Sequence, residues 1–272
     1  MILVNSIEIE QNHFSDGALH MNFALSSLSR GIAPINIKWY YENDGELFTI
    51  ICLAKKFADH KKTLYMPYCP HARMDRVKDE EDTFTLKYFC EVINSLKFER
   101  VYIVDAHSSV APALLDNVIN LSVETKINYA INNYLGAKKG ADDVVVIFPD
   151  EGAMKRYSQY INVPYTFGIK ERDWKTGEIT GYSLMDAKIV KDKYVLIVDD
   201  ICSRGGTIYR AAKLAEEAGA KGVSAYATHI ENTLFEAPLY PSNLITFFYT
   251  TQSICDFNKD ELAKVINTDL YS

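Results

Sequence analysis

The stretch Val195-Leu-Ile-Val-Asp-Asp-Ile-Cys-Ser-Arg-Gly-Gly-Thr207 decides the fold. A short apolar run ends in two adjacent carboxylates, and a glycine-rich turn then leads into a helical pattern. Segments that are hydrophobic on both faces are typical of buried parallel strands, and ligands of open α/β sheets bind beyond the carboxyl ends of such strands. Glycines let backbone N–H groups approach a phosphate, and a helix N-terminus favours negative charge. Asp199 and Asp200 would lie beside this cradle, placed to accept hydrogen bonds from sugar hydroxyls or to hold Mg²⁺.

Other parts of the chain repeat the same strand-and-helix rhythm. Further apolar runs rich in β-branched and aromatic residues are Thr63–Met66, Val101–Val104, Val144–Phe148 and Val223–Ala227. Helical spacing of apolar residues occurs at Leu86, Phe89, Cys90 and Ile93, and again at Ile208, Ala211, Ala212 and Ala215. Asp82 or Thr83 would cap the first of these helices, and Gly219 would end the second. Strands that alternate with helices predict an α/β fold with a parallel sheet.

Length and composition limit the class of protein. The chain has 272 residues, slightly less than two domains of ~150 residues each. Apolar residues make up 48% and the net charge is −7, which excludes a disordered chain and a general binder of nucleic acid or anionic membranes. Five cysteines without a C-x-x-C pair fit a reducing compartment, and neither an apolar run of ~18 residues nor a basic signal-peptide start is present. We expect a cytoplasmic protein with small-molecule partners.

The polar stretch Lys170–Gly181 has two interpretations. It follows a strand-like Tyr165–Ile169 and carries three cations and a tryptophan. Loops longer than ~12 residues without structure of their own are often functional lids or else disordered. Pattern alone favours neither a lid nor an ordinary surface loop.

Short motifs along the chain resemble those of the ribose-phosphate diphosphokinases, the PRPP synthetases. Val198–Thr207 resembles the phosphoribosyl-diphosphate motif of the type I phosphoribosyltransferase fold, and Pro67–Arg76 is similar to the family's P-Y-x-x-Y-A-R-Q-D-R signature. The remaining matches are Phe14–Gly17 to F-S-D-G-E, Asp105–His107 to D-x-H, Pro149–Gly152 to P-D-x-G, Lys170–Arg172 to the K-x-R of the catalytic flexible loop, and Thr228–His229 to T-H. Each match alone is weak, but the ordered set is specific.

This resemblance implies both the architecture and the reaction. The fold would be two tandem type I phosphoribosyltransferase-like α/β domains, each a mainly parallel sheet flanked by helices. The domains would span residues 1–123 on the ATP side and 124–253 on the ribose-phosphate side, and a helix in 254–272 would pack back on the first. The protein would transfer a diphosphoryl group from ATP to the anomeric hydroxyl of a ribose 5-phosphate-type acceptor, release AMP and use Mg²⁺.

The resemblance also assigns residues to roles. Lys170 and Arg172 would be catalytic, and His107 and Asp150 would contact the metal. ATP would be bound by Phe14, Asp16, Arg73 and His107. The ribose phosphate would be bound by Asp199, Asp200, Ser203, Arg204, Gly205, Gly206 and Thr207. Phe14 and Asp16 would complete the site of a neighbouring subunit, which implies a homodimer or larger homo-oligomer.

The sequence departs from the family pattern at positions that bear on specificity. Met74 replaces a Gln near the nucleotide, Ala18 replaces the Glu of F-S-D-G-E, and only 13 residues precede Phe14, where an additional strand and helix are expected. In the D-D-x-x-D-T-x-G-T loop the third Asp is Ser203 and the first Thr is Arg204. The loop gains a guanidinium and loses a carboxylate, which would suit an acceptor with more phosphate, such as ADP-ribose, in NAD salvage.

Two other classes of protein share parts of this pattern. A phosphoribosyltransferase would consume PRPP, and the Asp199-Asp200 motif permits it. The segment around Arg73 and the Lys170–Arg172 pair argue against it, because a single-domain transferase does not need them. An inactive regulatory homologue of the synthetase is the other alternative, and the presence of Lys170 and Arg172 argues for activity.

Overall fold

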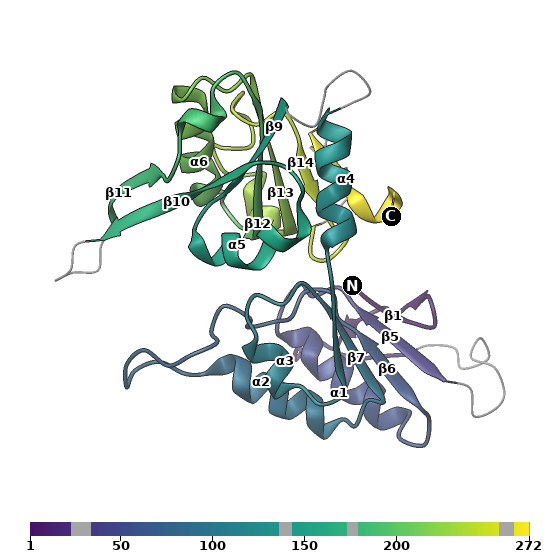
Figure 1. Ribbon diagram of the computed structural model, residues 1–272. Helices are drawn as coiled ribbons and strands as arrows, with labels where there is room; N and C mark the ends of the chain where they lie inside the picture. The colour runs from purple at the N-terminus through teal and green to yellow at the C-terminus, as the bar shows by residue number, and fades with distance from the viewer. Residues whose placement is uncertain (23–33, 136–142, 173–178, 256–263, 272) are drawn as a thin grey trace. The chain divides into compact units, whose positions relative to one another are not determined.

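The computed structural model describes residues 1–22, 34–135, 143–172, 179–255 and 264–271. The chain divides into two compact units, Met1–Ser122 and Val123–Ser272, and each unit has its own sheet and its own helices (Figure 1). Within the described ranges, no helix is long and apolar enough to cross a membrane.

The first unit is built on a six-stranded sheet with the order β2-β1-β5-β6-β7-β8. Its strands are β1 (Ile2–Val4), β2 (Ile7–Glu8), β5 (Ile35–Trp39), β6 (Lys62–Tyr65), β7 (Arg100–Val104) and β8 (Val118–Leu121). β5 to β8 run parallel, whereas β1 pairs antiparallel with both β2 and β5. A separate hairpin consists of β3 (Asn12–His13) and β4 (Leu19–His20). The helices are α1 (Gly45–Lys56), α2 (Thr85–Ser95) and α3 (Val110–Leu114).

The apolar stripe of α2 forms as its spacing predicts, but its cap does not. Leu86, Phe89, Cys90 and Ile93 are all buried. The residue before the helix is Phe84, which makes no side-chain cap, instead of Asp82 or Thr83. The Asp82 carboxylate is engaged in the preceding turn, where its Oδ2 accepts a hydrogen bond from the Lys78 backbone N–H at 2.9 Å. The stripe fixes which face of the helix is buried, whereas the local turn decides where the helix begins.

The second unit is built on a seven-stranded sheet with the order β11-β10-β9-β12-β13-β14-β15. Its strands are β9 (Val144–Phe148), β10 (Tyr165–Arg172), β11 (Ile179–Leu184), β12 (Tyr194–Cys202), β13 (Gly222–Ile230), β14 (Phe248–Thr250) and β15 (Val265–Asn267). Only β11 is antiparallel to its neighbour. The α-helices are α4 (Glu124–Leu135), α5 (Glu151–Tyr157) and α6 (Gly206–Glu217). Short 3₁₀ turns are η3 (Ser158–Tyr160), η4 (Lys188–Val190), η5 (Asn232–Leu234) and η6 (Thr268–Tyr271).

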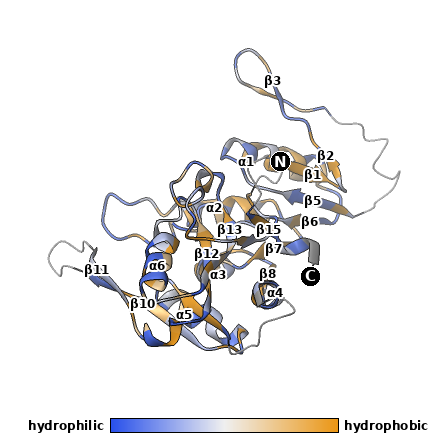
Figure 2. Ribbon diagram, turned by 90° about the horizontal axis from the view of Figure 1, so that it is seen from above, coloured by the Kyte–Doolittle hydropathy of each residue, from blue (hydrophilic) through white to orange (hydrophobic). Residues whose placement is uncertain are grey.

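Helices cover both faces of this sheet. Val195 and Ile197 of β12 pack with the buried stripe of α6 in one apolar core. Successive strand residues point to opposite faces, and the alternate residues Leu196 and Val198 are also fully buried. α4 and α5 contact β12 as well. Figure 2 shows much orange on the central strands β12 and β13, whereas α6 carries both colours, as expected for buried strands and an amphipathic helix. The mixed α/β architecture with mainly parallel sheets confirms the expected fold class.

Two expected segments have a different local structure. The ends of the stretch Lys170–Gly181 are strands, because β10 and β11 form an antiparallel pair with Lys170 opposite Tyr182; residues 173–178 lie outside the described ranges. Most of the expected C-terminal helix, residues 256–263, lies outside the described ranges, and Val265–Asn267 form strand β15, which pairs with β14 of the second unit. At the described ends of both segments, the backbone pairs with a neighbouring strand.

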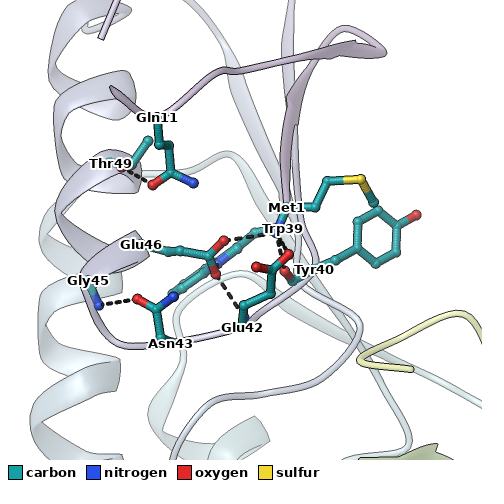
Figure 3. Close-up of polar contacts among 9 residues, drawn as sticks. All are labelled: Met1, Gln11, Trp39, Tyr40, Glu42, Asn43, Gly45, Glu46 and Thr49. Carbon is teal, nitrogen blue, oxygen red and sulfur yellow. Dashed lines mark hydrogen bonds and ion pairs between the residues drawn. The ribbon is translucent and has the colours of Figure 1, made fainter. Parts of the chain in front are cut away.

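A buried carboxylate ties the strands of the first unit to α1 (Figure 3). Glu46 is only 3% exposed, and its Oε2 accepts hydrogen bonds from Trp39 Nε1 and from the Glu42 backbone N–H, both at 2.8 Å. Its Oε1 accepts from the Met1 amine at 2.8 Å. The carboxylate therefore has a donor on each oxygen, and this satisfaction is what allows a charge to remain buried.

We predict that Glu46→Gln destabilises the first unit by about 2 kcal/mol, because an amide –NH₂ would then face another donor. Glu42 is the matched control, since its side chain is 64% exposed while it contacts the same amine. Glu42→Gln should change stability by about 0.5 kcal/mol or less. Chemical denaturation followed by tryptophan fluorescence measures both, and equal losses would contradict the role given to Glu46.

Candidate active site

The carboxyl ends of β9 and β12 place the acidic candidates of the second unit. The two strands are neighbours and run parallel, with Ile147 opposite Ile197. Asp150 follows β9 after a single proline, and Asp199 and Asp200 lie in the last part of β12. The sequence predicts that the strand ends at the acidic pair. β12 instead continues to Cys202, so the pair lies inside the strand.

Asp150 joins β9, α5 and β10. Its Oδ1 accepts a hydrogen bond from the Ala153 backbone N–H at 3.0 Å, which makes it the N-cap of α5. Its Oδ2 accepts from Lys170 Nζ at 2.8 Å. Partial burial raises the pKa of Asp150, but the hydrogen bonds from Lys170 and Ala153 outweigh it, so this pKa lies below its ordinary value. The carboxylate is therefore anionic at neutral pH and holds the Lys170 ammonium at the edge of the sheet.

Asp199 and Asp200 have different environments although they are adjacent. Asp200 is buried, and its Oδ2 accepts a hydrogen bond from Arg156 Nη1 at 2.9 Å. Asp199 Oδ1 accepts from the Asp200 backbone N–H at 3.0 Å. Burial raises the pKa of Asp199 well above its ordinary value, and the charges of Asp200 and Asp150 raise it further. Asp200 is thus the member paired with a guanidinium, whereas burial favours the protonated form of Asp199.

Tyr182 fastens the β10–β11 hairpin that carries Lys170. Its hydroxyl donates to the Pro149 carbonyl oxygen at 3.0 Å, next to Asp150. Its ring lies across Gly168, where a Cβ atom would overlap the Tyr182 ring and hydroxyl. Burial raises the pKa of Tyr182, and the carboxylates of Asp150 and Asp199 raise it further, so the hydroxyl stays protonated and donates. Tyr182 is absent from the sequence-based set of site residues, and for Arg156 the sequence leaves added phosphate affinity and a helix-surface role equally open.

Sequence signals for these two residues exist but are weak. Gly168, two positions before Lys170, marks a place where another side chain approaches the backbone closely. Arg156 is a cation at the end of the Asp150 segment, but an arginine on a helix is usually a surface residue. Only the pairing of distant strands shows which partner each one has.

The glycine-rich turn after β12 leads directly into the N-terminus of α6. Gly205 has a φ of +72° and precedes the first residue of α6, and a Cβ there would collide with Leu239. Gly206 is exposed, with no atom within 4 Å of where a Cβ would be. The Ser203 hydroxyl lies 3.2 Å from Thr233 Oγ1, Arg204 is exposed and Thr207 is half-buried. The first N–H groups of a helix have no intrahelical acceptor, and at α6 the space beside the exposed Gly206 is open.

The side chain of Lys170 is described, whereas that of Arg172, the other expected catalytic cation, is not. The register of the hairpin shifts between Glu171 and Arg172, so regular alternation does not place residues 170 and 172 on the same side. The Arg172 side chain lies outside the described part of the chain.

In the first unit, Phe14 and Asp16 lie in the turn of the β3–β4 hairpin. The Phe14 carbonyl accepts a hydrogen bond from the Gly17 N–H at 2.9 Å, and Asp16 Oδ1 accepts from the Ala18 N–H at 2.9 Å. Gly17 has a φ of +84°. Phe14 is 57% exposed, and its ring centroid is 4.9 Å from that of His20. The turn thus presents an aromatic ring and a carboxylate to solvent.

Arg73 and His107 belong to two loops of the same sheet. Asp105, two residues before His107, has a φ of +46° and is buried, and its N–H donates to the Leu121 carbonyl at 3.1 Å. The Ala106 N–H donates to Asn120 Oδ1 at 3.0 Å, so β8 holds the turn that presents the half-buried His107. Arg73 is exposed in the loop after β6. The candidate residues therefore form two groups, one in each unit.

The donor set fits Mg²⁺ held partly by substrate. Within the described residues, no group of three His, Cys, Asp or Glu side chains could hold a metal ion. Mg²⁺ at phosphate-transfer sites usually takes one or two carboxylates, and phosphate oxygens and water complete its shell. Asp150 offers an anionic carboxylate that is 42% exposed, which is compatible with this mode.

Comparison with known proteins identifies the family. A model of the phosphoribosyl transferase domain matches residues 118–238. A ribose-phosphate pyrophosphokinase from Pyrococcus abyssi is 30% identical over 232 residues, which cover 83% of this chain and 77% of the relative. The chain belongs to the ribose-phosphate pyrophosphokinase family. It is therefore a diphosphate-transferring kinase by family, as its motifs imply.

Further matches agree with this assignment. The ribose-phosphate pyrophosphokinase of Saccharolobus solfataricus is 27% identical over 230 residues, which cover 82% of this chain and 77% of the relative. The crystal structure of phosphoribosylpyrophosphate synthetase from Mycobacterium smegmatis superposes with a TM-score of 0.75 at 20% identity, over 97% of this chain and 87% of that chain. The pyrophosphokinase fold thus extends over both units.

The turn that opens α6 gives a direct test of its strained backbone. Gly205→Ala should destabilise the second unit by about 2 kcal/mol, because alanine resists a positive φ and its methyl group would collide with Leu239. Gly206→Ala is the matched control and should leave stability unchanged within about 0.5 kcal/mol, because the space around it is open. Thermal unfolding of both variants measures the difference, and a Gly206→Ala loss as large as that of Gly205→Ala would contradict this geometry.

Proposed function

We propose that this protein transfers a diphosphoryl group from ATP to the anomeric hydroxyl of ribose 5-phosphate. In this reaction the hydroxyl oxygen attacks the β-phosphorus of ATP, the bond from that phosphorus to the α-phosphate oxygen breaks, and AMP leaves. The hydroxyl proton is released. The observation that carries the proposal is one edge of the second sheet. Lys170 and the Asp199–Asp200 pair belong to β10 and β12, the two strands that flank β9, and the N-terminus of α6 follows the turn after β12.

Each of these groups matches one part of the proposed acceptor and donor. The exposed Gly206 and the turn from Ser203 to Thr207 would bind the 5-phosphate through backbone N–H groups. Asp200, held by the hydrogen bond from Arg156, would accept hydrogen bonds from ribose hydroxyls. Lys170 would stabilise the charge that develops on the transferred phosphates, with Arg172 as the expected second cation.

The first unit would bind the nucleotide. We assign Arg73 and His107 to ATP, and Asp150 and His107 to Mg²⁺, which supplies charge neutralisation at the phosphates when it is bound. Phe14 and Asp16 would serve the nucleotide site of a neighbouring copy, and the exposure of Phe14 in a hairpin turn fits that use. These assignments make the active form a homo-oligomer.

ADP-ribose is the second candidate acceptor, and it rests on the turn at Ser203 and Arg204. Ser203 has no negative charge, and Arg204 is exposed beside the open helix N-terminus. ADP-ribose has a free anomeric hydroxyl on its terminal ribose and carries a diphosphate where ribose 5-phosphate carries a monophosphate. An additional guanidinium at this turn would pair with the second phosphate.

Two other functions agree less well with the chain. A phosphoribosyltransferase would account for residues 118–238, but the pyrophosphokinase relatives align with about four-fifths of the chain. An inactive regulatory homologue would not need Lys170 to be held at the sheet edge by Asp150 and the Tyr182 hairpin.

Turnover should depend on Lys170. We predict that Lys170→Ala lowers kcat at least ~100-fold, because a cation that stabilises the developing phosphate charge is lost. Lys188, an exposed lysine in η4, is the control, and Lys188→Ala should keep wild-type kcat. AMP release from ATP, Mg²⁺ and ribose 5-phosphate is the measurement. Full turnover in Lys170→Ala would refute this mechanism.

The acceptor can be identified by comparing turnover with ribose 5-phosphate and with ADP-ribose. We expect AMP release with ribose 5-phosphate and ATP, and product mass spectrometry should show one added diphosphate. If the turn at residues 203–204 selects a second phosphate, ADP-ribose should have the higher kcat/KM, and Arg204→Thr should lower that value ~10-fold or more while leaving ribose 5-phosphate nearly unchanged. Absence of turnover with ADP-ribose would refute ADP-ribose as the acceptor. Absence of turnover with either compound would refute ribose 5-phosphate as well.

A further inference from the structure

Arg156 makes a contact that the proposed reaction does not yet use. It lies near the end of α5, the helix that Asp150 caps. Its Nη1 donates to Asp200 Oδ2 at 2.9 Å, across 44 positions of sequence. The side chains are 27% and 11% exposed, so the ion pair is largely shielded from water. A shielded pair of this kind is screened little by salt and is lost only at a high cost.

The pair leaves the Asp200 carboxylate with a single orientation. Its Oδ1 accepts from the Ile201 backbone N–H at 2.9 Å, and its Oδ2 accepts from Arg156. One oxygen is thus held by the strand and the other by α5. A carboxylate oxygen has two lone pairs, and these two donors fix the directions in which the lone pairs of the Asp200 oxygens point.

The neighbouring residues add a reason for this arrangement. Asp199 follows the buried part of β12 and crowds Asp200 with a second carboxyl group. Two carboxylates this close repel each other unless one is protonated or a cation compensates them. Lys170 is paired with Asp150, and Arg156 supplies a cation directly on Asp200.

We propose that Arg156 is a positioning residue, which holds the Asp200 carboxylate in the one orientation that accepts hydrogen bonds from the ribose hydroxyls of the acceptor. This inference rests on the proposed function. It assigns Arg156 to acceptor affinity without contact between Arg156 and the substrate. If Arg156 were only a surface residue of α5, its removal would not change the affinity for the acceptor.

The adjacent Lys155 provides a matched control on the same helix. Lys155 Nζ pairs with Glu151 at 2.9 Å, one helical turn away, and both side chains are more than 60% exposed. Removal of Lys155 deletes one positive charge from α5 without changing the contacts of Asp200. Any effect of overall charge near the site would appear in both variants, whereas loss of positioning would appear only when Arg156 is changed.

The kinetic test compares Arg156→Met, Arg156→Lys and Lys155→Met in the full chain. We expect Arg156→Met to raise KM and the dissociation constant for ribose 5-phosphate ~10-fold or more, because a charge-assisted hydrogen bond no longer fixes Asp200. KM for ATP should change less than ~2-fold, and Lys155→Met should leave both values unchanged. Arg156→Lys should recover part of the loss, since an ammonium restores the charge but not the fork geometry.

The result that overturns the inference differs from the one that overturns the proposed function. An Arg156→Met variant that binds ribose 5-phosphate as well as the wild type, or that raises both KM values equally, would overturn the positioning role. Absence of AMP release from the wild type would overturn the proposed function, while the dissociation constant for ribose 5-phosphate would still report on Arg156.

A double-mutant cycle covers the case in which Arg156→Met is poorly folded. Arg156→Met, Asp200→Asn and the double variant are compared in unfolding experiments and in ribose 5-phosphate binding. The double variant removes both charges and should regain stability, yet its affinity for ribose 5-phosphate should stay low. Recovery of both stability and affinity in the double variant would show that Arg156 acts on folding alone.

Discussion

Parallel pairing of β12 between β9 and β13 is the constraint on which the second unit depends. The pairing runs from Tyr194 on both sides, and it aligns the three strands so that their carboxyl ends lie at the same edge. A parallel sheet must be covered on both faces, which the apolar faces of α4, α5 and α6 provide. The strands therefore leave the core at the same edge. Their parallel pairing places Asp150, Asp200 and the turn before α6 at that edge.

Charged side chains at that edge are paired with one another. Lys170 is paired with Asp150, and Arg156 is paired with Asp200, each across adjacent elements of the same unit. A net charge of −7 is therefore compatible with a site for phosphorylated ligands, because the cations that would act on them are few and held in place. The ion pairs also join the hairpin and α5 to the central strands, so Lys170 and Asp200 are each held in place by a partner from another element.

Much of the fold could be predicted from local pattern. The apolar runs at Val144–Phe148 and Val223–Ala227 are buried strands, and the helical spacing at Ile208 is the buried face of α6, since burial on a regular element is written into its periodicity. The cap of α2 and the strand at Val265–Asn267 were not predictable in this way. The Asp82 carboxylate binds the Lys78 N–H in a turn, and Val265–Asn267 pair with β14. Both features depend on residues elsewhere in the chain.

Strand patterns and short motifs are local properties, and they are enough to predict an α/β protein of the ribose-phosphate pyrophosphokinase family. They also predict the acidic pair and the glycine turn, because glycine readily adopts the conformations that such a turn needs. Which carboxylate meets which cation is visible only in the folded chain, where Asp150 pairs with Lys170 and Asp200 with Arg156. Those pairs join residues 20 and 44 positions apart, and their distances follow from strand order and register, which no local pattern specifies.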